Sequence, residues 1–572
     1  MKKITLIQIR AGLYGFFVPF KDLYKSIPSN SLTFILFLFI PVFYIAASSI
    51  AYNARAPYYL FSIDPEYFYM YNGVILGAGN LSIQYYAHPG TPLHFLVAIS
   101  TRITDLFQQG SYMENFVNDP EMFIRSANLF INVIIAIILF IAARFTLKYT
   151  GSVWAALTVQ LSPFASFSLP EMAGRVYPEA LMMAPLLLII VMVIKNTFEP
   201  EKQHNLQKDL ILYALIIGFG AAVKLTFVPL LLLPLLLLKT SLREKMRYFA
   251  YSVLFFLIFA YPLLFNIGDS WDWITGIMVH SGKYGTGERN FIDISAAGMN
   301  ARNLLEMNSG FFYLVTASLL IIMVLSLNPV KKRLFPDQRI IRAILAIDLV
   351  VIACMAPILK HYSLYYFLPF TIFKFPVFLL LTALLLRIKV VAETRPFRLI
   401  IVLFACVYFV FTLAVQVGQF RTHAAINTAK HAKTIENARK LVSVIDPGKP
   451  IIIASPYYGS PFIEFAHYNG YIMSRHMKGF YTDYLREKFP GCYMSPTWSE
   501  NFYSWDNFVD FKDILATVKS SFYIYIGCGM EKDLPVIKSR ISQVLDMNSV
   551  MARTLYDDPD TGEQLIEIIV NQ

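Results

Sequence analysis

The chain has 572 residues, of which 56% are hydrophobic and only 15% are charged. Soluble globular proteins carry about 25% charged residues, and apolar runs of about 18 residues or more are typical of membrane-spanning helices. This composition excludes an ordinary cytosolic enzyme and a disordered chain. With Cys 4 in the whole sequence, it also excludes a disulfide-rich secreted scaffold. We therefore expect a polytopic membrane protein.

The formal charge of +11 comes from 49 Lys+Arg and 38 Asp+Glu. Residues 1–420 carry a net +12, whereas residues 421–572 carry a net −1. Basic clusters such as "KKR" at 331–333 lie between apolar runs, as is typical of loops on the cytoplasmic side of a membrane. We interpret the basicity as membrane topology and expect no nucleic-acid partner.

Eleven apolar stretches are predicted to cross the membrane. The first is too long for the apolar core of a signal peptide, so we expect it to be retained as a span. The predicted spans are 31–52, 123–143, 150–169, 178–194, 209–223, 225–238, 248–266, 309–327, 341–359, 364–386 and 399–418.

A weaker apolar stretch, 90–107, contains Arg102 and Asp105, and loop charge predicts its placement. If it does not cross, the cytoplasmic loops hold 23 Lys/Arg and the outer loops hold 8. If it crosses, this bias reverses, against the positive-inside rule. We therefore expect a juxtamembrane or re-entrant helix at 90–107, with the N-terminus cytoplasmic and the C-terminus outside.

Beyond residue 420 the composition becomes that of a soluble domain. An amphipathic helix is predicted at 424–445, and strands are predicted at 451–455, 521–527 and 563–570. We expect a membrane domain over 1–420 and an extracytoplasmic α/β domain over 421–572. Cys492 and Cys528 both fall in the second domain, and spacing alone leaves open whether they pair.

The first candidate site lies just after the first span, in "SIDPEYFY". Asp64 and Glu66 there could ligate a divalent cation or act as a general base. Asp64 could instead cap a helix that begins at Pro65, and both roles could hold at once. A second candidate, His88 in "YYAHPGTPLHFL", would place an imidazole at the membrane surface.

A very short predicted outer loop, "PEMAGRVYPEALMM", brings four more candidates together. They are Glu171, Arg175, Tyr177 and Glu179. A charge in the first turn of a span is costly unless it is paired or functional. Arg175 is the expected partner of Glu179, so a purely structural ion pair is the alternative interpretation.

Cations at predicted outer span boundaries form the last set of candidates: Lys224, Lys360 and His361. Lys360 could extend its charged group from the end of the span to the aqueous surface, which would explain its position without a catalytic or binding role. Outward-facing cations nevertheless oppose the topological bias, and a phosphate-bearing lipid ligand would account for them.

The order of these motifs resembles the GT-C superfamily of membrane glycosyltransferases. It is most similar to protein O-mannosyltransferases and bacterial lipid A aminoarabinose transferases. The matching features are an acidic "DPE" after the first span, "HPGTPL", the span "RSANLFINVIIAIILFIAAR", "LSPFASFS" and the Arg-containing loop "GRVYPE". The resemblance covers about residues 30–240 and extends to "HYSLYYFLP". It places "DPE" where the family has "DE", and no counterpart is assigned to residues 421–572.

The resemblance implies an inverting glycosyltransferase in a bacterial inner membrane. Its donor would be a sugar on a polyprenyl phosphate, and its acceptor lipid A, a surface polysaccharide or a protein. Asp64 and Glu66 would be catalytic. A divalent cation, Mg²⁺ or Mn²⁺, is an open expectation, with Asp64, Glu171 and His280 as candidate ligands. The donor phosphate would be bound by Arg175, Lys224, Lys360 and His361, and the acceptor positioned by His88, Glu171, Tyr177 and Glu179.

Two other classes compete with this interpretation. A lipid-linked saccharide flippase or transporter, or a polysaccharide polymerase, should carry charges in mid-span and often repeat symmetry. Asp348 and Lys374 are the main in-span charges, and no internal repeat is apparent. A binding domain on a membrane anchor would not need eleven spans. The enzyme is therefore preferred.

Overall fold

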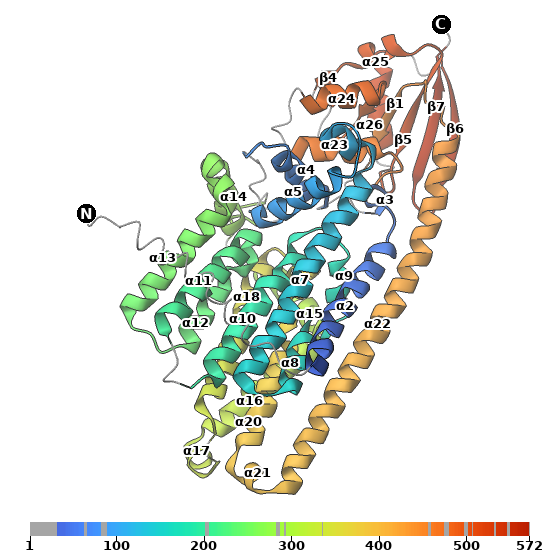
Figure 1. Ribbon diagram of the computed structural model, residues 1–572. Helices are drawn as coiled ribbons and strands as arrows, with labels where there is room; N and C mark the ends of the chain where they lie inside the picture. The colour runs from blue at the N-terminus through green and yellow to red at the C-terminus, as the bar shows by residue number, and fades with distance from the viewer. Residues whose placement is uncertain are drawn as a thin grey trace, which may run out of the picture.

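The computed structural model describes most of the chain after residue 30. The described residues are 31–61, 66–81, 89–200, 205–281, 287–290, 293–334, 336–455, 459–473, 480–496, 501–505, 507–530, 533–545 and 550–570. They form a helical bundle with a mixed sheet near the C-terminal end of the chain (Figure 1). This confirms the predicted fold class of a polytopic helical membrane protein with a C-terminal α/β domain.

Among the described residues, 8 helical segments are long and apolar enough to cross a membrane. They coincide with eight of the eleven predicted spans. The segments are α2 (Ser31–Asn53), α7 (Pro120–Thr150), α10 (Pro178–Phe198), α11 (Leu206–Val223), α16 (Ser309–Ser326), α18 (Gln338–Lys360), Tyr365–Arg387 and α22 (Arg395–Ser443). Within Tyr365–Arg387 the chain forms α19 (Leu364–Phe367), η6 (Leu368–Phe373) and α20 (Lys374–Arg387).

The other three predicted spans are helical but divided into shorter pieces. The pieces are α8 (Val153–Gln160), η1 (Ser162–Phe164) and α9 (Ser168–Ala173); η3 (Leu225–Leu231) and α12 (Leu232–Leu237); and α13 (Leu242–Phe259) with η4 (Tyr261–Asn266). Proline interrupts each stretch, because it cannot donate the backbone hydrogen bond that a continuing helix needs. In α13 the charged first turns "LREKMR" also lower the hydropathy.

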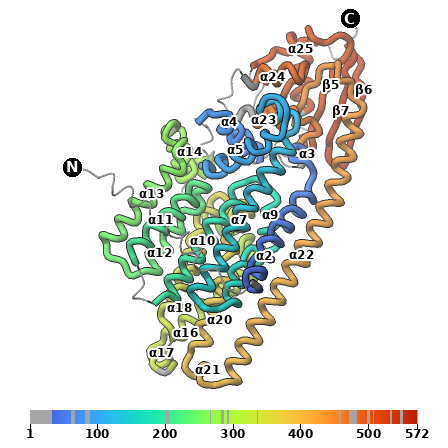
Figure 2. Tube along the Cα trace, viewed as in Figure 1, coloured from blue at the N-terminus to red at the C-terminus, as the bar shows by residue number. Residues whose placement is uncertain are grey.

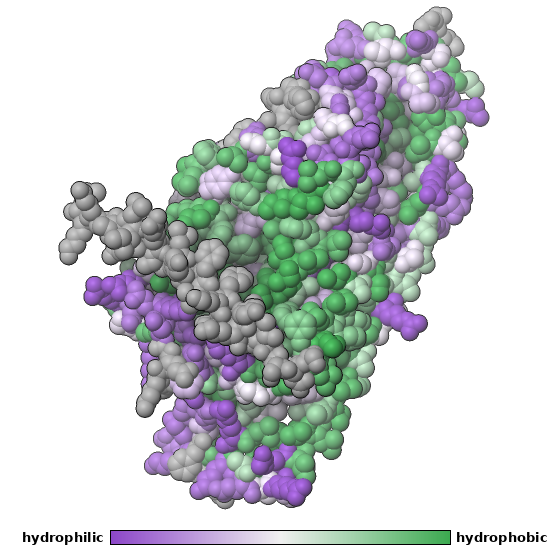
Figure 3. All heavy atoms as spheres, viewed as in Figure 1, coloured by the Kyte–Doolittle hydropathy of each residue, from purple (hydrophilic) through white to green (hydrophobic). Residues whose placement is uncertain are grey.

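Apolar residues cover the middle of the bundle, and hydrophilic residues gather toward its two ends (Figure 3). One end carries α17 (Asn328–Leu334) and α21 (Lys389–Glu393) (Figure 1). The opposite end, here called the sheet end, carries α3 (Tyr58–Phe61), α4 (Glu66–Gly77), α5 (Thr91–Asp105), α6 (Tyr112–Asn118) and α14 (Ile267–Val279). The helix α15 (Ile294–Met307) follows in the same long loop as α14.

The stretch predicted as a juxtamembrane helix, 90–107, forms α5, which lies beside α4 at the sheet end (Figure 1). Its 15 residues are fewer than a span needs. The two helices approach closely at Gly73, where a Cβ would lie 2.3 Å from Cγ1 of Val97. A glycine is therefore required at this crossing.

The last span and the predicted amphipathic helix at 424–445 are one continuous helix, α22. Its 49 residues correspond to a length of about 73 Å at 1.5 Å per residue. The hydrocarbon core of a bilayer is about 30 Å thick, so α22 extends well beyond it. The helix runs along one side of the bundle and ends beside the sheet (Figure 2). The predicted domain boundary at 420/421 falls within this helix.

The C-terminal domain is built on a 7-stranded sheet with strand order β4-β3-β2-β1-β5-β7-β6. The central strand β1 pairs in parallel with β2 and β5, and the outer pairs are antiparallel. The strands are β1 (Ile451–Ala454), β2 (Cys492–Met494), β3 (Phe502–Ser504), β4 (Asn507–Val509), β5 (Ser521–Ile526), β6 (Met551–Asp558) and β7 (Glu563–Ile569). The three predicted strands are thus confirmed as β1, β5 and β7.

Alternating side chains of β5 pack on the two faces of this sheet. Phe522 and Ile524 join a separate apolar core with α25 (Phe511–Thr517) and α26 (Asp533–Ser542). Tyr523 and Tyr525 belong instead to the large core that continues through α23 (Ile463–Met473), α24 (Phe480–Lys488) and the membrane helices. One face of the sheet is therefore packed into the rest of the molecule.

Candidate functional site

Glu66, the first residue of α4, is fully buried at the sheet end of the bundle. Its Oε1 accepts a hydrogen bond of 2.8 Å from the backbone N–H of Val176. Nη2 of Arg55 lies 3.7 Å from Oε1, and Nε of Arg175 lies 3.8 Å from Oε2. A buried carboxylate is costly unless it is paired and hydrogen-bonded, and two guanidinium groups supply that compensation here.

Arg55 also joins Glu66 to a second carboxylate, that of Glu121. Its Nη2 lies 3.5 Å from Oε1 of Glu121, and its guanidinium lies 4.1 Å from the ring centroid of Tyr52. The Tyr52 hydroxyl donates to Glu121, and the backbone N–H of Tyr58 donates to Glu121 Oε2 at 3.0 Å. Sequence reasoning missed Arg55 and Glu121, although both lie just outside apolar spans, as the chosen candidates do.

Lys224 and Glu179 form a buried ion pair between the end of α11 and the start of α10. The Lys224 ammonium also lies 3.8 Å from the ring centroid of Tyr366 and 5.9 Å from that of Tyr365. The expected pairing of Glu179 with Arg175 is therefore wrong. The short predicted loop instead divides its charges, because Arg175 lies against Glu66 and Glu179 lies against Lys224.

Tyr177 connects these two ion-pair groups. Its ring lies 5.1 Å from the Arg175 guanidinium and 6.4 Å from the Tyr365 ring, which it meets edge to face. Burial raises the pKa of Tyr177, so its hydroxyl stays protonated at neutral pH. We refer to the connected set as the charged cluster; it consists of Arg55, Glu66, Arg175, Tyr177, Glu179, Lys224 and Tyr365.

Lys360, His361 and His280 gather elsewhere, at the C-terminal end of α14. Lys360 Nζ donates to the carbonyl of Met278, and His361 Nε2 lies 2.9 Å from the carbonyl of Ile277. His280 Nδ1 lies 3.0 Å from the carbonyl of Gly287. A cation at a helix C-terminus interacts favourably with its carbonyl groups, so the structure gives Lys360 a structural role in holding α14.

Glu171 lies in α9 and contacts α22 through a hydrogen bond of 3.1 Å from Nδ2 of Asn427 to its Oε1. Asp64 and His88 lie outside the described residues. Within the part of the chain that is described, no three His, Cys, Asp or Glu side chains gather as metal ligands would. Because Asp64 is not among those residues, the divalent cation stays a prediction.

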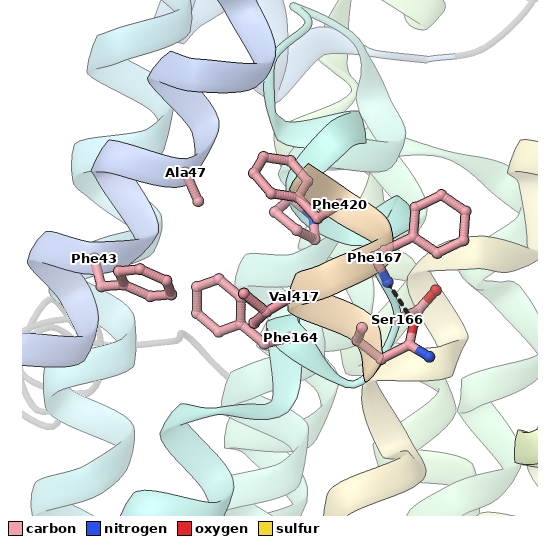
Figure 4. A pocket seen from close by; sticks show the side chains of 9 residues that line it. Phe43, Ala47, Phe164, Ser166, Phe167, Val417 and Phe420 are labelled. Carbon is pink, nitrogen blue, oxygen red and sulfur yellow. Dashed lines mark hydrogen bonds between the residues drawn. The ribbon is translucent and has the colours of Figure 1, made fainter. Parts of the chain in front are cut away.

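A small apolar pocket lies where α2, α9 and α22 meet (Figure 4). A hydrogen bond of 2.8 Å from the backbone N–H of Phe167 to Oε1 of Gln416 joins two of its lining residues. The pocket is lined by Phe43, Ala47, Phe164, Ser166, Phe167, Pro170, Gln416, Val417 and Phe420. Most of these lining residues are apolar, and none is charged.

The two cysteines of the C-terminal domain do not form a disulfide with each other in the structure. Cys492 is buried in β2, and burial raises the pKa of its thiol. Cys528 is exposed after β5.

Comparison with known proteins gave matches among solved structures only. No protein-family model matches the chain, and no curated protein matches its sequence. The chain is similar to the crystal structures of ArnT from Cupriavidus metallidurans bound to undecaprenyl phosphate and in the apo state. Sequence identity is 11% in both cases, with 92% of this chain and 97% of the other covered, and the TM-scores are 0.44 and 0.47, respectively.

Proposed function

We propose that the protein is an inverting glycosyltransferase that moves a sugar from a polyprenyl-phosphate donor to an acceptor hydroxyl or amine. The acceptor belongs to a lipid, a surface glycan or a protein. The observation that carries the proposal is the charged cluster, in which the buried side chains of two cations and two carboxylates gather with the partly exposed Arg175 at one end of a membrane bundle. Such groups are rarely kept in an apolar surrounding unless they are paired or functional.

The reaction needs a base, cations and access from the lipid phase. The acceptor oxygen or nitrogen attacks the anomeric carbon while the bond from that carbon to the phosphate oxygen breaks. The acceptor's proton passes to a carboxylate, for which we propose Asp64, two residues before Glu66. Negative charge develops on the departing lipid phosphate, and Arg175 and Lys224 are the proposed cations that stabilise it.

The remaining candidates keep supporting roles in this proposal. Glu66 and Glu179 compensate the cations in the absence of the donor. Tyr177, Glu171 and His88 position the acceptor. Lys360 and His361 hold the C-terminal end of α14 and affect binding of the donor phosphate through the position of that helix. Loop charge supports an orientation with the sheet end outside a bacterial-type inner membrane, and we propose that the reaction occurs on that outer face. A divalent cation, Mg²⁺ or Mn²⁺, remains part of the proposal to be tested with chelator.

The deciding experiment uses purified protein and a panel of labelled polyprenyl-phosphate sugars. Wild type and Asp64→Asn are compared for sugar release, including slow hydrolysis without an acceptor. A missing general base lowers turnover by roughly 10²- to 10⁴-fold. Glu114→Gln is the matched control, because Glu114 caps the exposed start of α6 and lies outside the charged cluster. Its turnover should stay within about twofold of wild type.

A lipid-linked saccharide transporter is the second candidate, and the in-span carboxylate of Asp348 favours it. Asp348 is buried in α18 and accepts a hydrogen bond of 2.5 Å from Ser318 in α16. Donor binding without turnover, unchanged by Asp64→Asn, would support transport and contradict the transferase. Turnover that is equal in wild type and Asp64→Asn would overturn Asp64 as the base.

A further inference from the structure

The C-terminal domain is docked onto the first two helices of the sheet end, α3 and α4, through residues that follow β1. The backbone N–H of Ser460 donates a hydrogen bond of 2.7 Å to the carbonyl of Tyr59 in α3. Gly459, with φ +139°, lies so close to α3 that a Cβ would be 2.7 Å from the carbonyl oxygen of Leu60. Both backbone conformation and space therefore require glycine at 459.

A second contact holds α4. The Tyr71 hydroxyl shares a buried hydrogen bond with Nδ1 of His467 in α23. One helical turn after His467, the backbone of Gly470 packs directly against the Tyr71 ring. A Cβ at this position would lie 2.4 Å from Cδ2 of Tyr71. Burial, together with the nearby Lys488, lowers the pKa of His467 to about 3, so the ring stays neutral at physiological pH.

A third contact reaches α6, which follows α5 in the same loop. Lys488 Nζ donates to Oδ1 of Asn118, and the Tyr484 hydroxyl lies 3.5 Å from the same oxygen. The core that includes Tyr468 and Tyr525 is continuous with the core of the membrane helices. These contacts are those of a packed interface and differ from those of a tethered module that moves freely.

From these contacts we infer that the C-terminal domain is a positioning element of the catalytic centre. It holds α3 by Gly459 and Ser460 and holds α4 by His467 and Gly470. These helices are the two that flank residues 62–65, and α4 begins at Glu66, the buried carboxylate of the charged cluster. The inference rests on the proposed function, because it assigns the domain a role in that reaction.

The geometry explains why two contacts are needed. The Glu66 carboxylate lies within 4 Å of two guanidinium groups that belong to other segments, so a shift of α4 along or about its axis changes both distances. Misplacement by about 1 Å can cost roughly 10²-fold in rate when reacting groups must be aligned. Ser460 and His467 hold the two helices at points on either side of Glu66 in sequence.

The test replaces Gly459 by alanine and uses Gly529→Ala as its matched control. Gly529 has φ +74° in the same domain, but nothing lies within 4 Å of a Cβ placed there. Both variants therefore carry the backbone cost of a side chain at positive φ, and only Gly459→Ala pushes on α3. Tyr71→Phe is a milder second variant, which keeps the ring against Gly470 and removes the bond to His467.

Two readouts separate the docking from the reaction. Hydrogen exchange of full-length protein in detergent is measured on peptides covering α3 and α4. We expect about tenfold or faster exchange there in Gly459→Ala, a smaller increase in Tyr71→Phe and none in Gly529→Ala. Sugar transfer is then measured as kcat and KM. Gly459→Ala should lose about 10- to 100-fold in kcat, with donor KM changed by less than about threefold.

Each result decides one question. Unchanged exchange in α3 and α4 of a folded Gly459→Ala variant would overturn the docking contact, whatever the protein's activity. Faster exchange with unchanged kcat would overturn the positioning role and leave the transferase intact. If Gly459→Ala does not fold, Tyr71→Phe decides in the same way. No turnover by wild type with any donor would refute the proposed function, and the exchange result would then concern docking alone.

Discussion

The buried pair of Lys224 and Glu179 allows a quantitative test of how the charged cluster is assembled. Both side chains are at most 4% exposed, and the ammonium also faces the Tyr366 ring. Replacing Glu179 by Gln removes the carboxylate that pairs with this buried ammonium. Removing one partner of a buried pair costs about 3–5 kcal/mol, and we expect this loss for Glu179→Gln.

The double variant Glu179→Gln/Lys224→Met isolates the interaction from the burial cost. Because no uncompensated charge remains, its loss of stability should be at least about 2 kcal/mol smaller than the sum of the two single losses. Equilibrium unfolding in mixed detergent micelles measures all three variants against wild type. Glu306→Gln is the control, because the Arg302–Glu306 pair in α15 is exposed and its loss should leave the unfolding curve unchanged.

Two outcomes would refute this reasoning. Additive single losses would show that Lys224 and Glu179 do not interact in solution. A full loss in Lys224→Met together with none in Glu179→Gln would indicate that another anion, such as Glu66 on the far side of Tyr177, compensates the lysine. In that case the division of charges described for the short loop would be wrong.

Three further predictions address the scaffold. Gly73→Ala should destabilise the protein by about 1–3 kcal/mol in the same unfolding assay, because its Cβ would overlap Val97, and equal stability would contradict the close helix crossing. The pKa of His467 is lowered to about 3 by burial, whereas an unfolded histidine titrates near 6.5. The unfolded state therefore binds more protons between these values, so stability should fall as pH drops below about 6.5, and less steeply in His467→Gln; parallel pH profiles would refute this. Maleimide should label exposed Cys528 in the native protein and leave buried Cys492 unlabelled, as mass spectrometry of the peptides would show.

Hydropathy was sufficient to predict where most spans lie, because an apolar run of about 18 residues or more rarely forms anything other than a membrane-spanning helix. It could not predict where a run is divided. The stretch 225–238 is as apolar as a true span but contains Pro229 and Pro234, and it forms a 3-10 segment followed by one short helix. Proline positions alone would not have corrected that prediction, because α2, α10 and α18 continue through Pro41, Pro185 and Pro357.

Short strands were missed for a different reason. The strands β2, β3 and β4 each have 3 residues, too few for alternation to be recognised. The strand β6 is longer, but its first half is exposed on both faces and carries no apolar pattern. These strands are specified by pairing with their neighbours, which a local pattern does not encode.

Sequence analysis named many of the residues that meet in the charged cluster but did not predict which of them form ion pairs with each other. Five of the proposed residues, from Glu66 to Lys224, do meet in the charged cluster. The partner of Glu179 could not be identified from sequence, since Arg175 is four positions away and Lys224 is 45 residues away. Packing of α10 against α11 decides between them, and that packing depends on the whole bundle.

The continuity of α22 could have been predicted from the spacing of prolines in the sequence. No proline occurs between Pro396 and Pro447, and the amphipathic stretch at 424–445 begins only a few residues after the span ends. Nothing local therefore stops the helix, and the last span continues into the C-terminal domain as one rigid element. Because α22 fixes the domain at one end and Gly459, Ser460 and His467 fix it at the other, the sheet has two attachments to the bundle. A domain held in this way can transmit its position to α3 and α4, which a domain on a flexible linker could not do.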